Sequence, residues 1–196
     1  RRTMRHLAGD AAASGSAERL ERRKGDVRAC LAREADPKWY NRQIDSLPHA
    51  YAFNLFSHNA GIDAETGYNG EELKAMEEIR KIMSAPDLRL SFTCVRVPVL
   101  RAHSMSLTVE FENPITPQEA EEWLAAAPGV KLVNDALRNH FPMPNEASGG
   151  DDVLVGRIRA DLSDPTGRTL SIFVVGDQLL KGAALNAVQI AEVVAA

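Results

Sequence analysis

The stretch RLSFTCVRVPVLRAHSMSLTVEFE, residues 89–112, decides the expected fold class. Residues 89–99 are strand-like, with Val95, Val97 and Val99 alternating with other residues, and apolar residues alternate again over residues 105–112, which is the period of a half-buried strand. Only the short connection LRAHS separates the two runs, so we expect them to pair as antiparallel neighbours. Pro98 removes a backbone donor from the first run, which indicates that this run serves more than packing.

An amphipathic helix is predicted on each side of these two runs. Asn69 can cap a helix over residues 70–83, in which apolar residues recur every three or four positions and Glu71 and Glu72 are among the polar residues of the other faces. Thr116 begins a capping box with proline at the first helical position. This second helix is expected to end near Ala127, before Pro-Gly.

The remaining chain adds strands and a last helix. A short strand is expected near residues 130–133 and a loop over residues 139–152; two further strands and a mostly apolar helix follow, at residues 153–162, 169–176 and 179–196. Strands and helices in this order predict an α+β fold with a mixed, largely antiparallel sheet and helices on one face.

Composition bounds the kind of protein. The 196 residues are 44% hydrophobic, enough for one domain, or one domain plus a fragment. No apolar run approaches the roughly 20 residues of a membrane span, and no secretory signal is recognisable. The two cysteines are too few for a disulfide framework or a cysteine zinc site. We therefore expect a soluble protein that is not secreted, without a membrane partner.

Charge is uneven along the chain. Residues 1–42 hold 11 of the 23 basic residues and only 6 of the 27 acidic ones. Such a segment can contact nucleic acid or a membrane, but interspersed acidic residues favour a solvated helix, so no nucleic-acid partner is expected. Residues 1 to about 48 have the composition of a boundary region, and the organised domain is expected to start near Tyr51.

Arg96 and His103 form the first candidate for chemistry. A guanidinium can hold a carboxylate with two donors, and an imidazole can give or take a proton near neutral pH. Arg96 lies on the opposite alternation to its neighbouring valines, and the bend at Pro98 allows His103 to converge on the same space. The alternative interpretation, a surface arginine and a turn histidine, is the simpler one on spacing alone.

Glu71 and Lys74 are a second candidate, because residues three apart share a helix face. They could receive a zwitterionic or phosphorylated substrate, although a solvated ion pair is the simpler interpretation. The histidines show no metal-binding spacing, and no metal site is expected. No dinucleotide fingerprint, phosphate loop or serine-hydrolase elbow is present in the sequence.

Six segments in a fixed order resemble one enzyme family. They are YAFNLFSHNA, GYNGEELKAMEEIRKIM, CVRVPVLRAHS, NHFPMPNEAS, DDVLVGRIRADLS and GDQLLKGAALNAVQIAE. With compatible gaps over about residues 51–194, they resemble the C-terminal half of aspartate-semialdehyde dehydrogenases of the plant and related bacterial branch. The resemblance implies an NADP-binding Rossmann domain, missing here, followed by a catalytic and dimerisation domain at residues 51–180. Residues 181–196 would be a helix that packs on that missing domain.

The resemblance also implies a reaction and a set of site residues. NADPH reduces L-aspartyl-4-phosphate to aspartate semialdehyde and phosphate, on the route to lysine, threonine and methionine, through a cysteine nucleophile. By motif, His103 is the acid/base, Arg96 binds the substrate α-carboxylate and Gln178 contacts NADP. Glu71 would face the substrate amino group and Lys74 the phosphate. The cations thus receive anions, and the carboxylate receives the ammonium.

Upstream residues match less well. Ser14 and Gly15 align with a Ser-Gly pair that contacts NADP in the family, but Ala11 replaces a substrate-binding glutamine. The nucleophilic cysteine and the NADP loop precede the matching region, so residues 1–50 are interpreted as a diverged or truncated segment. Neither Cys30 nor Cys94 is expected to be the nucleophile, and the chain alone is expected to be inactive.

The resemblance further implies a homodimer or tetramer, located in a plastid stroma or a bacterial cytoplasm. Two alternatives stay open. The chain could be a non-catalytic dimerisation scaffold that lost its nucleotide domain, or part of a reductase for another amino-acid acyl phosphate. Retention of polar residues at all four motif positions argues against a pure scaffold.

Overall fold

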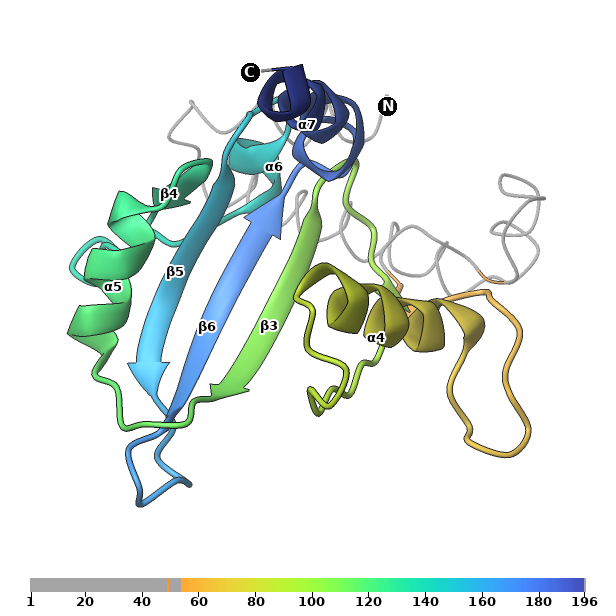
Figure 1. Cartoon of the computed structure of the whole chain (residues 1–196), viewed down its shortest axis with the longest axis horizontal. Helices are drawn as coiled ribbons and strands as arrows, with labels where there is room; N and C mark the ends of the chain where they lie inside the picture. The colour runs from red at the N-terminus through yellow and green to blue at the C-terminus, as the bar shows by residue number, and fades with distance from the viewer. Residues whose placement is uncertain (1–48, 50–53, 196) are drawn as a thin grey trace, which may run out of the picture. The chain divides into compact units, whose positions relative to one another are not determined.

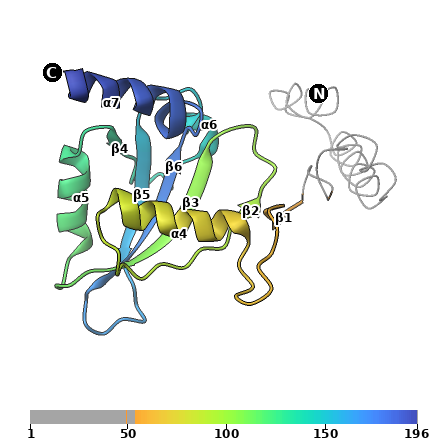
Figure 2. The same ribbon diagram turned by 45° about the vertical axis from the view of Figure 1, so that its right-hand side comes forward.

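The computed structural model describes His49 and residues 54–195. These residues form two compact units, with the division between Pro98 and Val99, and each unit is described by itself. Figures 1 and 2 show the elements of both.

The first unit contains one long helix and a minimal strand pair. Strand β1 (Phe56–Ser57) pairs antiparallel with β2 (Val95–Arg96), with Phe56 opposite Arg96. Helix α4 (Gly70–Ile82) begins at Asn69, whose side chain accepts the Glu72 N–H while the Glu72 carboxylate accepts the Asn69 N–H. This capping box confirms the predicted helix start. Acidic residues in its first turn and basic residues in its last favour the helix dipole.

The expected pairing of residues 89–99 with residues 105–112 is wrong. Only Val95 and Arg96 of the first run are in a strand, and their partner is β1. Pro98 cannot donate to a ladder, and residues 97–102 form bends, so the chain leaves the strand before it could turn back on itself. The burial expected at Val95 and Arg96 is reversed: Arg96 is half-buried, as are Phe92 and Cys94, whereas Val95 is exposed.

The second unit is built on a four-stranded sheet of order β3-β6-β5-β4 (Figure 1). Its strands are β3 (His103–Glu110), β6 (Thr169–Gly176), β5 (Val153–Ala160) and β4 (Val130–Leu132). The β3–β6 and β5–β6 pairs are antiparallel and the β4–β5 pair is parallel. The predicted α+β fold with a mixed, largely antiparallel sheet is therefore confirmed.

Helix α5 (Pro117–Ala126) covers one face of this sheet and begins with the predicted capping box at Thr116. Its Ala120 packs in a core with Val155 and Val174. The neighbouring residues Leu154 and Val175 point to the opposite face. There they pack with α6 (Pro144–Ala147), a four-residue helix inside the predicted loop. Helix α5 thus follows the predicted arrangement of helices on one face of the sheet, and the short helix α6 covers part of the other face.

The chain ends in a helix that starts irregularly. A π-helical segment, η1 (Leu180–Ala184), leads into α7 (Leu185–Ala195), close to the predicted helix limits. The π turns satisfy backbone groups through Gly182 N–H to Asp177 O at 3.0 Å and Ala184 N–H to Leu179 O at 3.2 Å. In both views α7 lies at the end of the sheet where β3 begins and β6 ends (Figures 1 and 2). Within residues 54–195 there is no helix with the length and apolarity of a membrane span.

Candidate functional site

Glu71 and Lys74 meet on the first turns of α4. Lys74 Nζ lies 3.3 Å from Glu71 Oε1, and the two side chains are 44% and 55% exposed for the glutamate and the lysine respectively. The helix spacing that predicted a shared face is confirmed. An exposed pair of this kind contributes little to stability, so both groups can exchange their mutual contact for a ligand at small cost.

Glu72, which follows Glu71, is buried, although it was placed with the polar residues outside the apolar face of the helix. It is only 7% exposed. Its carboxylate accepts the Asn69 N–H at 2.9 Å and the Cys94 N–H at 2.7 Å. These two backbone hydrogen bonds lower the pKa of Glu72, and the bond from Asn69 has the larger effect. The carboxylate therefore ties the start of α4 to the segment that leads into Arg96.

Arg96 is held by β1 and the residues after it. Its Nη2 lies 3.0 Å from Asn59 Oδ1 and 2.9 Å from His58 Nε2. A neutral imidazole has one acceptor nitrogen, and His58 Nδ1 is also 3.2 Å from the Ala60 N–H, so His58 can accept from only one of the two. Arg96 forms no ion pair within the described part of the chain. Its charge is thus available for an external anion.

His58 and Asn59 were not predicted as site residues. The motif LFSHNA contains both, but only the pairing of Phe56 with Arg96 brings them beside the guanidinium. A strand of two residues has no periodicity to read, so the sequence offered no signal for this contact.

His103 is the first residue of β3, and its side chain is exposed. Ala102, just before it, is buried and has a φ of 79°, a conformation that residues with a Cβ rarely adopt. Gln178 Oε1 accepts the Ala102 N–H at 2.8 Å. His103 also pairs with Gly176, two residues before Gln178. The structure therefore brings His103 and Gln178 to one end of the sheet.

Asp177 links this turn to the rest of the unit and was not predicted. It is fully buried, and its Oδ2 lies 2.6 Å from Arg101 Nη2. Burial alone raises the pKa of such a carboxyl, but the Gly149 N–H, Arg101 and the amides of Leu179 and Leu180 outweigh it and lower the pKa to about 2. Asp177 is therefore ionised throughout the neutral range.

The predicted site residues divide between the two units. Glu71, Lys74 and Arg96 belong to the first, whereas His103 and Gln178 belong to the second. The convergence of Arg96 and His103 stays a prediction. Ser14 and Gly15 lie outside the described residues.

Cys94 does not readily form a thiolate. Burial raises its pKa, and the charges of Glu72 and Glu71 raise it further. Among the residues that the structure describes, no cluster of three histidine, cysteine or acidic side chains could hold a metal ion. Within residues 54–195, therefore, we find neither a reactive thiol nor a metal site that could supply the nucleophile.

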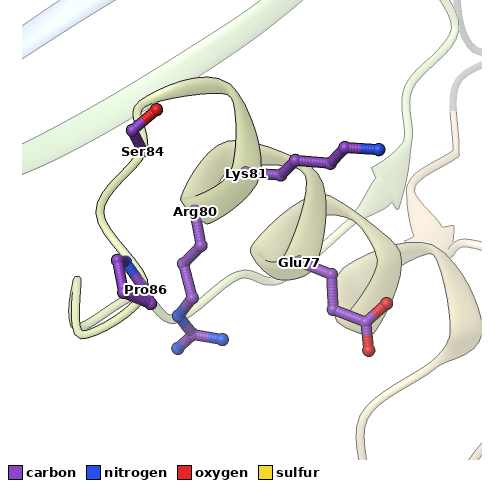
Figure 3. Close-up of a pocket in the computed structure, with 5 residues that line it drawn as sticks. All are labelled: Glu77, Arg80, Lys81, Ser84 and Pro86. Atoms are coloured by element: carbon purple, nitrogen blue, oxygen red, sulfur yellow. The ribbon is translucent and has the colours of Figure 1, made fainter.

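Two shallow hollows lie on the first unit. One, of about 420 Å³, is at the C-terminal end of α4 and is lined by Glu77, Arg80, Lys81, Ser84 and Pro86 (Figure 3). The other, of about 450 Å³, includes Glu72, Ser57 and Tyr68 in its lining. Arg80 in the first hollow is engaged by the Leu88 carbonyl. Predicted site residues line neither hollow.

The comparisons with known proteins agree with the expected family. The family model described as semialdehyde dehydrogenase, dimerisation domain, matches residues 2–181. Aspartate-semialdehyde dehydrogenase of Synechocystis sp. is 56% identical over 150 residues, which cover 76% of this chain and 44% of the relative. The enzyme of that name from Aquifex aeolicus is 42% identical over 182 residues, covering 93% and 51%.

Solved structures give the same result. Aspartate semialdehyde dehydrogenase II of Vibrio cholerae, complexed with ASA, has a TM-score of 0.69 and 37% identity, covering 74% of this chain and 42% of that one. The chain spans about half the length of the relatives it matches. Since the family model covers most of its residues, the chain belongs to the semialdehyde dehydrogenase family and carries that family's dimerisation domain.

Proposed function

We propose that this chain supplies the catalytic and dimerisation part of an NADP-dependent aspartate-semialdehyde dehydrogenase, which reduces L-aspartyl-4-phosphate to aspartate semialdehyde and phosphate. The observation that carries the proposal is the contact between Gln178 and the Ala102 N–H, because it holds the expected cofactor residue against the residue that precedes His103, the expected acid/base. The relatives named aspartate-semialdehyde dehydrogenase support the same reaction.

The first unit is proposed to bind the substrate. Arg96 would hold the α-carboxylate, since its charge has no acidic partner within the described residues. Glu71 would receive the α-ammonium and Lys74 the phosphate, each replacing their mutual contact of 3.3 Å. A small zwitterionic phosphate thereby finds one group of opposite sign for each of its charges.

The second unit is proposed to move protons beside the cofactor. His103 is exposed on its strand, so its imidazole can exchange a proton with a bound reactant. Because Gln178 Oε1 already accepts from Ala102, its amide Nε2 is the group left to donate to an acceptor on NADP. NADPH supplies the hydride when bound. The nucleophilic cysteine is proposed to come from sequence outside the matching motifs.

A chimera tests this function. Residues 54–196 replace the corresponding segment of the Synechocystis enzyme, and phosphate-dependent oxidation of aspartate semialdehyde by NADP is measured. We expect activity within about tenfold of the parent, loss of more than 10³-fold for His103→Ala, and none from the 196-residue chain alone. A folded chimera without activity, or turnover by the isolated chain, contradicts the proposal. Glutamate semialdehyde serves as the competing substrate, because preference for it favours another acyl-phosphate reductase.

The proposal includes self-association as a homodimer or tetramer, since the matching model is a dimerisation domain. Two-fold association uses one surface on both subunits. Sedimentation of the chain at several concentrations measures it directly, and a monomer at all of them contradicts this part. The named relatives are bacterial, and we propose a cytoplasmic location.

A further inference from the structure

The Asp177 carboxylate accepts from four donors, more than a turn between two elements needs. Its Oδ2 accepts the Gly149 N–H and an Arg101 donor, both at 2.6 Å. Its Oδ1 accepts the N–H groups of Leu179 and Leu180 at 2.9 and 3.3 Å. The Asp177 carboxylate has no exposed surface, and it is the acceptor on which residues 101, 149 and 179–180 meet. Losing its charge leaves these four donors poorly satisfied.

The segments that meet at Asp177 are those that carry the proposed site. Arg101 lies two residues before His103, and Gln178 follows Asp177 directly. Ser148, next to Gly149, donates to the Pro144 carbonyl at 2.6 Å and lies 3.4 Å from the Arg101 carbonyl. We call Asp177, Arg101 and Gly149 the hub. It holds the turn of residues 101–103, which leads into β3, against the residues that follow β6.

Backbone strain at this turn explains why it must be held. Ala102 adopts a φ of 79° although it has a Cβ, a strained conformation that persists only when the surroundings determine it. Three contacts do so: burial of its methyl group, the Gln178 hydrogen bond and the anchoring of Arg101. If Arg101 were released, relaxation of Ala102 would turn the peptide that aims His103.

We propose that Asp177, through Arg101, is a positioning residue that sets the placement of His103 relative to Gln178. The inference rests on the proposed function for the roles of those two residues, but the hub itself does not. Asp177 contacts neither substrate nor cofactor in this assignment. It acts on the reaction by holding the turn of residues 101–103 against residues 177–180.

Kinetics of the chimera provide the first test. Asp177→Asn is expected to lower kcat by about 10- to 100-fold with the KM for phosphate within threefold, because misplacement affects the transition state more than binding. Asp164→Asn is the matched control, since Asp164 also accepts two backbone N–H groups, in the turn between β5 and β6. Equal kcat for Asp177→Asn and the parent overturns the proposal.

A second readout needs no activity. In the isotope-labelled 196-residue chain, Asp177→Asn is expected to displace the ring signals of His103. The signals of His49, whose ring contacts Phe56 in the first unit, stay in place. A folded variant with unchanged His103 signals overturns the proposal even if the chimera is inactive, and inactivity of the unmutated chimera counts only against the proposed function.

If Asp177→Asn does not fold, a milder substitution at Arg101 tests the same proposal. Arg101→Lys keeps the three amide contacts of Asp177 and the positive charge but removes the guanidinium fork. We expect the same direction of change in kcat and in the His103 signals, with a smaller loss of about three- to tenfold. Wild-type values for both readouts overturn the proposal.

Discussion

Among the residues that the structure describes, each unit buries one carboxylate that ties separate segments together, but the two are held differently. Glu72 in the first unit receives two backbone N–H groups and has no cationic partner among the described residues. Asp177 in the second receives three, together with Arg101. The second unit also has a four-stranded sheet, whereas the first has a two-residue ladder.

The difference corresponds to the proposed division of labour. Groups that bind substrate charges can adjust, so a helix end and a short ladder suffice to carry Glu71, Lys74 and Arg96. An acid/base must be placed within about 0.5 Å, and His103 lies on the unit with the four-stranded sheet. The following predictions test this contrast, beginning with the largest effect.

Close packing of the second unit is tested at Gly156. A Cβ at this position would lie 2.0 Å from the Val133 carbonyl oxygen and 2.7 Å from Pro142 Cδ, so Gly156→Ala must displace β4 from β5. We expect a loss of about 3 kcal/mol or more in the free energy of unfolding. Denaturant unfolding followed by circular dichroism measures it.

Gly61 in the first unit is the matched control. A Cβ there meets nothing within 4 Å, and Gly61→Ala is expected to change stability by less than about 1 kcal/mol. Similar losses for the two variants would contradict the contrast in packing.

The two buried carboxylates are compared by amide substitution at pH 7. Either change places an NH2 group among N–H donors. Asp177→Asn also unpairs Arg101, so we expect it to lower the melting temperature by about 5–10 °C and Glu72→Gln by about 2–5 °C. Asp151→Asn, at an exposed aspartate, controls for net charge. A larger effect for Glu72→Gln would reverse the comparison.

Acid pH sharpens the same comparison. The Asp177 pKa is lowered to about 2 from 3.8, so its ionised form stabilises the fold above pH 4, and this contribution is lost as the pH falls from 4 to 2. The wild-type melting temperature should therefore drop more steeply over this window than that of Asp177→Asn. Parallel curves from pH 5 to pH 2 would contradict the assignment.

Helix capping gives a smaller effect. Asn69 accepts the Glu72 N–H, but its own Nδ2 is buried without a partner in the structure. Asn69→Ala is expected to cost about 1 kcal/mol, whereas Asn69→Ser keeps an acceptor, removes the unsatisfied amide and stays within about 0.5 kcal/mol. Thermal unfolding of both variants checks this order, and the reverse order would show that Nδ2 has a partner.

Local patterns predicted most of the fold. The capping boxes at Asn69 and Thr116 lie within four residues of sequence, and β5 and β6 are runs of eight residues rich in apolar and β-branched residues, so both kinds of element were recognised. Failures arose where long-range contacts decide. β2 pairs with a segment about 40 residues earlier, and the four-residue α6 is too short to have a period.

The site shows the same limit. Motif resemblance indicated the residues with exposed functional groups, including His103 and Lys74. It did not indicate Asp177, Glu72 or Asn59, because a buried carboxylate or a supporting amide looks like any solvated polar residue until its partners are known. Asp177 and Arg101 are 76 positions apart, and no spacing rule joins them.

The smallest structural effect is expected at Lys74. Its ion pair with Glu71 is exposed on both sides, so Lys74→Met should change the free energy of unfolding by less than about 0.5 kcal/mol. If Lys74 binds phosphate, the same variant raises the KM for phosphate in the chimera by about tenfold or more, the value of one charge-assisted contact. Lys81→Met, at the exposed end of α4, should leave that KM unchanged. Loss of stability with an unchanged KM would make the Glu71–Lys74 pair a structural feature, and substrate binding by the first unit would then depend on Arg96 alone.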